Sequence, residues 1–209
     1  MTKVRNIFHE FLKHYFHSGV WNRDTKWLGV PILNFPLDLF LFQEMIVEIK
    51  PDLIVECGTY NGGSALFFAS ILDLINKGKV ITIDTAPQPN LPSHPRITYF
   101  KASSTSPEAI AKVKAMINPG DAVMVFLDSD HRKNHVLSEM RLYNQFVSKG
   151  SYMVVEDTCI NGHPILPNYG PGPMEAVEEF LIGNNEFFVD ESKHKFFVTF
   201  HPRGFLRKK

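Results

Sequence analysis

Four carboxylates stand where apolar runs end, and they are the residues of this sequence best suited to chemistry. Asp128 and Asp130 follow the run 122–127, and Glu156 and Asp157 follow a second run. Carboxylate oxygens are the ligands that a hard divalent ion such as Mg²⁺ takes. Such an ion lowers the pKa of a bound hydroxyl, which creates an oxygen nucleophile near neutral pH. We interpret the four acids as a metal site; the alternative is a set of solvated loop carboxylates.

A histidine directly follows the first acidic pair. Because an imidazole titrates near neutral pH, His131 could accept the proton of that hydroxyl. We therefore take His131 and Asp128 as candidate catalytic residues. The alternative for His131 is a bystander in the turn.

A glycine-rich stretch forms the second constellation. An apolar run stops at Glu56, and Gly58, Gly62 and Gly63 follow it. Glycines let a backbone approach a ligand closely, and the free N–H groups at the start of the next helix would face that ligand. Asp84 ends the following apolar run, about 20 residues on, where an acid receives the ribose hydroxyls of a bound nucleoside.

The spacing of these glycines separates two nucleoside cofactors. Gly58-x-x-x-Gly62-Gly63 departs from the G-x-G-x-x-G pattern that cradles the pyrophosphate of NAD. It suits S-adenosylmethionine, which carries a sulfonium and an amino acid that Glu56 would meet. The predicted cofactor contacts, with two serines near the adenine, are Glu56, Gly58, Thr59, Asn61, Gly62, Gly63, Ser64, Asp84, Ser103, Ser104 and Asp128.

Strands and helices must bring these residues to one edge of a sheet. Strand-like apolar runs at 52–56, 80–83, 97–100, 122–127 and 152–155 alternate with helical patterns, of which the principal ones are 37–49, 65–75, 107–116, 136–146 and 173–182. This alternation predicts a parallel sheet covered on both faces, with ligands beyond the carboxyl ends of its strands. Two last runs, 186–189 and 195–200, predict a hairpin. The expected fold is α/β, a doubly wound, mostly parallel seven-stranded sheet with a C-terminal antiparallel hairpin, as in class I methyltransferases.

The remaining segments frame this sheet. We expect residues 1–36 to form an N-terminal helix and a packing loop, and residues 37–209 the methyltransferase domain, together one structural domain. The first helix is amphipathic, so its apolar face packs either on the same chain or on a neighbouring subunit of a homo-oligomer. Loop 158–173 is rich in glycine and proline and is a predicted lid. His163 and Tyr169 would contact a ring-shaped acceptor such as a sugar; a plain surface loop is the alternative.

Composition narrows location and partners. The 209 residues include 22 basic and 22 acidic side chains, which argues against a nucleic-acid partner. The start lacks the apolar core of a signal peptide, and no run of about 18 apolar residues could span a bilayer. We therefore expect a cytoplasmic protein without a membrane partner, with Cys57 and Cys159 reduced and the basic end 203–209 solvated.

Several motifs together resemble one family. They are Trp27-Leu28-Gly29-Val30-Pro31, Pro36-Leu37-Asp38-Leu39, Pro51-Asp52-Leu53-Ile54-Val55-Glu56-Cys57-Gly58-Thr59, Gly62-Gly63-Ser64-Ala65, Leu127-Asp128-Ser129-Asp130-His131, Gly150-Ser151-Tyr152 and Val155-Glu156-Asp157-Thr158. From about residue 21 onward the chain resembles the cephalosporin hydroxylase family. The resemblance implies an S-adenosylmethionine-dependent methyltransferase fold. It also implies magnesium bound by Glu156, Asp157 and Asp130, with Asp128 as the competitor of Asp130.

A more distant resemblance, to the catechol O-methyltransferases, places Asp128 on the metal aspartate and His131 on the catalytic lysine. Both assignments stay open. Members of the first family methylate hydroxyls of antibiotics and sugars. The resemblance thus implies a magnesium-dependent O-methyltransferase acting on a hydroxyl of a small molecule, a sugar or secondary metabolite. The alternatives are a metal-dependent hydroxylase that uses His131 and His163, and a cofactor-binding subunit without turnover.

Overall fold

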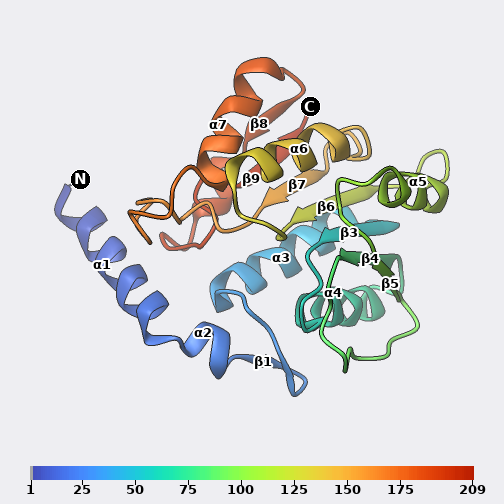
Figure 1. Cartoon of the computed structure of the whole chain (residues 1–209), viewed down its shortest axis with the longest axis horizontal. Coiled ribbons are helices and arrows are strands. Elements are labelled where there is room, and N and C mark those ends of the chain that lie inside the picture. The colour runs from blue at the N-terminus through green and yellow to red at the C-terminus, as the bar shows by residue number, and fades with distance from the viewer. Residues whose placement is uncertain (1) are drawn as a thin grey trace.

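The computed structural model describes residues 2–209, and their side chains from residue 6 onward. Helices and strands alternate through most of the chain (Figure 1). In order they are α1 Thr2–Ser18, α2 Val20–Arg23, β1 Lys26–Trp27, β2 Val30–Pro31, α3 Pro36–Ile49, β3 Leu53–Cys57, α4 Gly63–Leu74, β4 Lys79–Asp84, β5 Ile97–Lys101, α5 Pro107–Met116, β6 Val123–Leu127, α6 Lys133–Tyr143, β7 Tyr152–Val155, α7 Pro173–Gly183, β8 Phe187–Val189, the short 3₁₀ helix η1 Glu191–His194 and β9 Phe205–Lys208.

Seven strands form the central sheet, in the order β5-β4-β3-β6-β7-β9-β8. The first five are parallel, and β9 pairs antiparallel with both β7 and β8. The chain order reverses beside β3, whose neighbours are β4 and β6. In such sheets ligands bind beyond the carboxyl ends of the strands at this reversal. The predicted α/β fold with its mostly parallel seven-stranded sheet is confirmed.

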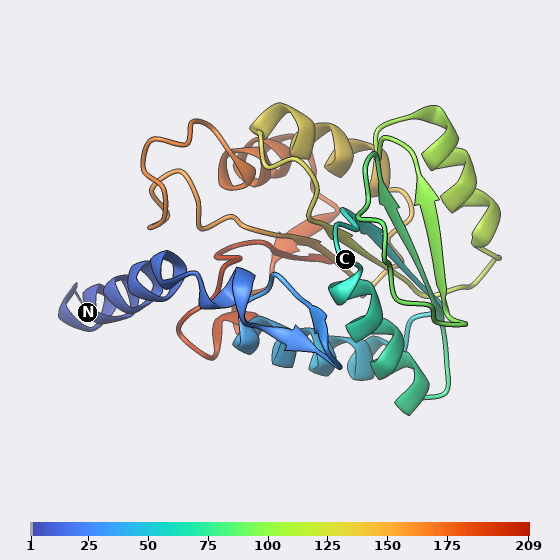
Figure 2. The ribbon, with the colours of Figure 1, turned by 60° about the horizontal axis from the view of Figure 1, so that its bottom comes forward.

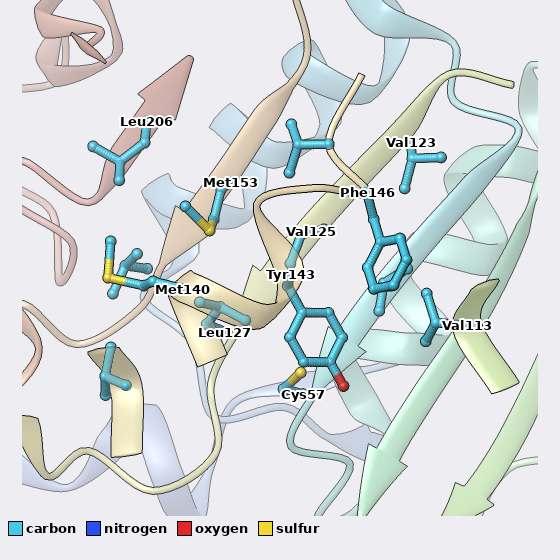
Figure 3. Packing of buried hydrophobic residues seen from close by; sticks show 14 of the residues in the cluster. Cys57, Val113, Val123, Val125, Leu127, Met140, Tyr143, Phe146, Met153 and Leu206 are labelled. Atoms are coloured by element: carbon cyan, nitrogen blue, oxygen red, sulfur yellow. The ribbon is translucent and has the colours of Figure 1, made fainter. Parts of the chain in front are cut away.

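Helices cover both faces of the sheet, as Figure 2 shows: α3 and α4 lie on one face, and α5, α6 and α7 on the other. The strands are therefore buried on both sides, which explains why they are continuous apolar runs rather than alternating ones. Beneath α3 and α4, Phe42, Phe68 and Phe126 pack ring against ring. On the other face Tyr143 lies beside Cys57 (Figure 3). Both Cys57 and Cys159 are free and buried.

The C-terminal strands differ from the prediction in one respect. Residues 195–200 form no strand, and the second antiparallel strand is β9, inside the basic end that was expected to be solvated. Leu206 of β9 is fully buried, and Arg207 and Lys208 bond to the backbone carbonyls of Gly150 and Asn144. The basic residues of β9 suggested a solvated terminus. Long basic side chains can, however, lie along a sheet while their charged ends reach its edge.

The N-terminal helix packs on the chain's own body. Leu12 and Phe16 of α1 join a small core with Phe35 and Phe200. The outer side of α1 leaves Ile7 and Phe11 exposed, so the homo-oligomer stays a prediction. None of the helices in residues 2–209 is long and apolar enough to cross a lipid bilayer.

Candidate active site

A cavity of about 510 Å³ opens at the carboxyl edge of the parallel strands. The turns that follow β3, β4, β5, β6 and β7 contribute to its wall, and the N-terminal segment from Trp21 to Asn34 closes one side. A volume of this size matches typical small-ligand sites. The predicted cofactor and metal residues can therefore be located relative to this cavity.

The glycine turn after β3 forms the floor of this cavity. Gly58 has φ +105°, and a Cβ there would lie 1.9 Å from the carbonyl oxygen of Asp128. A Cβ on Gly63 would lie 2.1 Å from the carbonyl oxygen of Pro31. Only glycine fits at these two positions, because the neighbouring backbones leave no room for a side chain. The turn thus holds β3, β6 and the N-terminal segment in close contact.

Asp84 stabilises the glycine turn from the end of β4. Its Oδ2 accepts hydrogen bonds from the backbone N–H groups of Thr59 at 3.0 Å and Tyr60 at 2.9 Å, and its Oδ1 accepts one from Ala86. Asp84 also lines the cavity together with Thr59, Asn61 and Ser64. A carboxylate has about four acceptor positions, so these bonds leave capacity for a ligand hydroxyl.

Glu56 lies beneath the turn and does not line the cavity. It is 1% exposed, and its Oε2 has no hydrogen-bond partner. Burial raises the pKa of Glu56 to about 8, although hydrogen bonds from Ser64 and Thr82 oppose this rise. At neutral pH the group is therefore mostly a neutral acid under the turn.

Two serines and a histidine line the far end of the cavity. Ser103 and Ser104 follow β5, and the Ser104 hydroxyl lies 3.2 Å from Nε2 of His135. Glu139 is buried behind them, where its Oε1 accepts a hydrogen bond from Ser129 at 2.6 Å. This end is polar but less charged than the acidic end.

Asp128, His131 and Asp157 form the acidic end. His131 Nε2 lies 3.2 Å from Asp128 Oδ1 and 3.3 Å from Asp157 Oδ2. Among residues 6–209 these three are the only group of His, Cys, Asp or Glu side chains arranged to hold a metal ion together. All three line the cavity.

The electrostatics of this group favour a cation between the two carboxylates. Burial alone would lower the pKa of His131, but the hydrogen bond with Asp128 and the charges of Asp157 and Asp128 raise it to about 9. Burial raises the pKa of Asp157 to about 6, although the charge of His131 opposes this rise. At neutral pH the imidazole is therefore a cation held by two carboxylates.

The other two predicted metal ligands lie outside this group. The Asp130 carboxylate turns back to Arg132, accepting its backbone N–H at 2.9 Å and facing its guanidinium at 3.2 Å. Glu156 is 3% exposed, and its Oε2 accepts a hydrogen bond from Asn34 Nδ2 at 2.7 Å. Burial and the neighbouring charges of Asp128 and Asp157 hold the pKa of Glu156 well above its usual range.

The two residues expected to contact an acceptor have different surroundings. His163 Nε2 lies 2.8 Å from Oε1 of Glu175, the acid in the first turn of α7, so His163 anchors the loop to that helix. Tyr169 is 43% exposed at the tip of the same loop. Burial raises the pKa of Tyr169, the charges of Asp130 and Asp157 add to this rise, and the charge of Arg132 opposes it. Neither Tyr169 nor His163 lines the cavity.

Sequence reasoning missed Trp21, Asn34, His135 and His201, which surround or support the cavity. Trp21 lies on the short helix α2 and Asn34 in the loop before α3, where no periodic pattern marks either residue. His135 lies on α6, whose pattern marks only its apolar face. Two of the resemblance motifs, Trp27-Leu28-Gly29-Val30-Pro31 and Pro36-Leu37-Asp38-Leu39, flank Asn34 and are the only signal near it.

The parallel sheet with its antiparallel end, and a cavity at the glycine turn, define the class I methyltransferase architecture. The rhamnosyl O-methyltransferase/CmcI family matches residues 19–209. The chain belongs to this family. The predicted family is therefore confirmed, and so is the predicted enzyme class, an S-adenosylmethionine-dependent O-methyltransferase.

Three relatives illustrate the similarity. A rhamnosyl O-methyltransferase of Mycobacterium bovis is 39% identical over 211 residues, which cover 96% of this chain and 84% of the relative. A magnesium and S-adenosylmethionine form of CmcI superimposes with a TM-score of 0.69 at 20% identity, over 88% of this chain and 76% of that chain. MycE from the mycinamycin biosynthetic pathway, in complex with Mg, SAH and mycinamycin VI, gives a TM-score of 0.51 at 18% identity, over 77% of this chain and 40% of that chain.

Proposed function

We propose that the protein transfers a methyl group from S-adenosylmethionine to a hydroxyl of a sugar, with Mg²⁺ as its metal ion. One observation carries this proposal: a single cavity joins the glycine turn, Asp84 and the group Asp128, His131 and Asp157. The relatives named rhamnosyl O-methyltransferase support a deoxysugar as the acceptor class.

The cofactor fits the glycine end of the cavity. Gly58, Gly63 and Ser64 line this end, and the free backbone N–H groups at the N-terminus of α4 would meet the cofactor there. Asp84 would receive the ribose hydroxyls with its remaining acceptor capacity. We assign the adenine to the end formed by Ser103, Ser104 and His135. Glu56 would act from below, by supporting the turn near the amino-acid end.

The metal fits the acidic end, because the carboxylates of Asp128 and Asp157 already hold a positive charge there, that of the His131 imidazolium. Of the four predicted acids we assign Asp128 and Asp157 as the principal ligands. When bound, Mg²⁺ would lower the pKa of the acceptor hydroxyl and orient it. Asp130 and Glu156 would then act as neighbours of the ligands.

His131 is the residue placed to manage the acceptor's proton. Its Nε2 lies between the two carboxylates. Because the imidazole is a cation at neutral pH, it could accept the proton of a substrate hydroxyl only after losing its own, which a divalent cation held by the same carboxylates would favour. Asp128 and Asp157 hold the ring, so proton transfer would require little reorientation. The protein's main contribution would be to align the acceptor oxygen with the methyl group while the loop excludes water.

The acceptor would bind between the N-terminal segment and loop 158–173. Trp21 lines the cavity, and Tyr169 is exposed on loop 158–173 outside the cavity lining, where it could close over a bound acceptor. Aromatic faces suit the apolar side of a pyranose ring, while polar side chains such as Asn34 suit its hydroxyls. The geometry does not favour the hydroxylase alternative, because Glu175 holds His163, the second histidine that it would use.

A methyl-transfer assay tests the proposal. Radiolabelled S-adenosylmethionine, a simple aryl rhamnoside and the full chain should give a methylated sugar with Mg²⁺ present. Removal of the metal with EDTA should abolish transfer, and Asp157→Asn should lower kcat/KM by at least about tenfold. Equal turnover with and without metal would refute the metal assignment, and absence of transfer to every glycoside tried would refute the sugar acceptor.

A further inference from the structure

The segment from Phe200 to Gly204 lies along the turn that follows β7 and is bonded to it at four points. Val155 N–H donates to the Gly204 carbonyl at 2.9 Å, and Cys159 N–H donates to the Phe200 carbonyl at 3.0 Å. Between these two bonds, the Thr158 hydroxyl donates to the Pro202 carbonyl at 2.7 Å and Asp157 N–H donates to Nδ1 of His201 at 2.8 Å. The C-terminal segment thus brackets the turn that carries Asp157.

Asp157 needs this support because its backbone is strained. Its φ is +54°, a left-handed conformation that costs a non-glycine residue free energy unless its surroundings hold it. In this conformation its carboxylate reaches His131 and the cavity. Asp157 N–H has a side-chain nitrogen as its acceptor rather than a carbonyl oxygen. The bond to His201 is therefore the one interaction that ties this amide to a side chain of the core.

Burial, stacking and a hydrogen bond fix the orientation of the His201 ring. His201 is 1% exposed and stacks on Phe42 with an interplanar angle of 11°. Because Nδ1 accepts the amide of Asp157, the ring proton must be on Nε2. A ring whose Nδ1 accepts a hydrogen bond carries a single proton, so His201 is neutral in this structure.

Two buried acids face the protonated nitrogen. His201 Nε2 lies 3.5 Å from Asp38 Oδ2 and 3.4 Å from Glu156 Oε2, and it makes no regular hydrogen bond to either. Asp38 Oδ2 also accepts the backbone N–H of Phe200 at 2.8 Å. These two carboxyl groups favour the tautomer with its proton on Nε2. In the other tautomer the lone pair of Nε2 would face their oxygens.

We propose that His201 is a positioning residue for the metal-binding turn: as the neutral Nε2–H tautomer, it accepts the Asp157 amide and so aims the Asp157 carboxylate at Asp128 and His131. This inference rests on the proposed metal site. It adds a residue 44 positions away from Asp157, which touches neither the cavity nor the reacting groups.

Two matched substitutions separate positioning from packing. The amide oxygen of asparagine can take the place of Nδ1, whereas glutamine places its amide near Nε2 and leaves the Asp157 N–H without its acceptor. Mg²⁺ binding by calorimetry should weaken about ten- to hundredfold in His201→Gln and stay within about threefold of the wild type in His201→Asn. The unfolding temperature of the metal-free protein should fall in both variants, because both lose the ring that stacks on Phe42.

NMR provides a readout that does not depend on metal. Long-range ¹H–¹⁵N spectra of the metal-free wild type should show the proton of His201 on Nε2, and the Asp157 amide resonance should shift strongly in His201→Gln and weakly in His201→Asn. A proton on Nδ1, or equal loss of Mg²⁺ affinity in both variants, would overturn the inference. If the wild type binds no Mg²⁺, the proposed metal site fails, while the tautomer and the amide shift still decide the role of His201.

Discussion

Asp128 and Asp130 are two positions apart after β6, yet their carboxylates have opposite surroundings. Both residues line the cavity, but Asp128 lies against His131, whereas Asp130 is partly exposed and pairs with Arg132. Spacing alone could not separate them, because both follow the same strand and both suit a divalent ion. The difference between the two aspartates arises from the backbone of this turn, in which the Arg132 N–H donates a hydrogen bond to the Asp130 carboxylate.

This difference makes a prediction at the residue scale. Asp128→Asn should weaken Mg²⁺ binding by at least about tenfold, because it removes the negative charge of a ligand. Asp130→Asn should change it less than about threefold, since an exposed ion pair contributes little. Calorimetric titration of both variants measures this. The reverse order of effects would show that Asp130 is the ligand.

Glu175 shows how one element organises another. In the first turn of α7 it accepts hydrogen bonds from His163, Asn161 and the Gly172 N–H, and thereby ties loop 158–173 to the helix. Sequence reasoning placed this loop beside the site and predicted contact between His163 and an acceptor. The contacts between Glu175 and the loop could not be predicted, because an acid in the first turn of a helix is already explained by the helix dipole.

A pH dependence follows for this element. Burial alone would raise the pKa of Glu175, but the hydrogen bonds from His163, Gly172 and Asn161 outweigh it and lower the pKa to about 2. A depressed carboxyl pKa adds stability above its unfolded value of about 4.3, and this contribution is lost as the pH falls toward 2.

Urea unfolding of the wild type and Glu175→Gln at two pH values measures that contribution. The wild type should be the more stable protein at pH 5.5, and about half of the difference should be gone at pH 3. A stability difference independent of pH would contradict the assignment.

At the scale of the whole molecule, the sheet was predictable and its C-terminal edge was not. Buried parallel strands are continuous apolar runs, so β3, β4, β6 and β7 were recognisable, and their carboxyl ends placed the acids together. β9 was missed because Arg207 and Lys208 disguise a strand between β7 and β8. Contacts such as that between His201 and Asp157 depend on this edge and have no local signal.

The cavity itself is a property of the whole chain. Its wall combines the N-terminal segment, the glycine turn and the turns after four further strands. We propose that this cavity binds S-adenosylmethionine in the orientation set by Asp84 and the glycine turn. The demethylated product, S-adenosylhomocysteine, tests this claim without requiring the acceptor to be known.

Calorimetric titration of S-adenosylhomocysteine into the folded wild-type chain is the most direct measurement. We expect one site per chain, and binding at least about tenfold weaker in Asp84→Ala, which loses the ribose acceptor and the support of the turn. Glu186→Ala, a change at an exposed acid remote from the cavity, should bind as the wild type does. No binding to the wild type, or equal binding by Asp84→Ala, would show that the cavity does not hold the cofactor in this way.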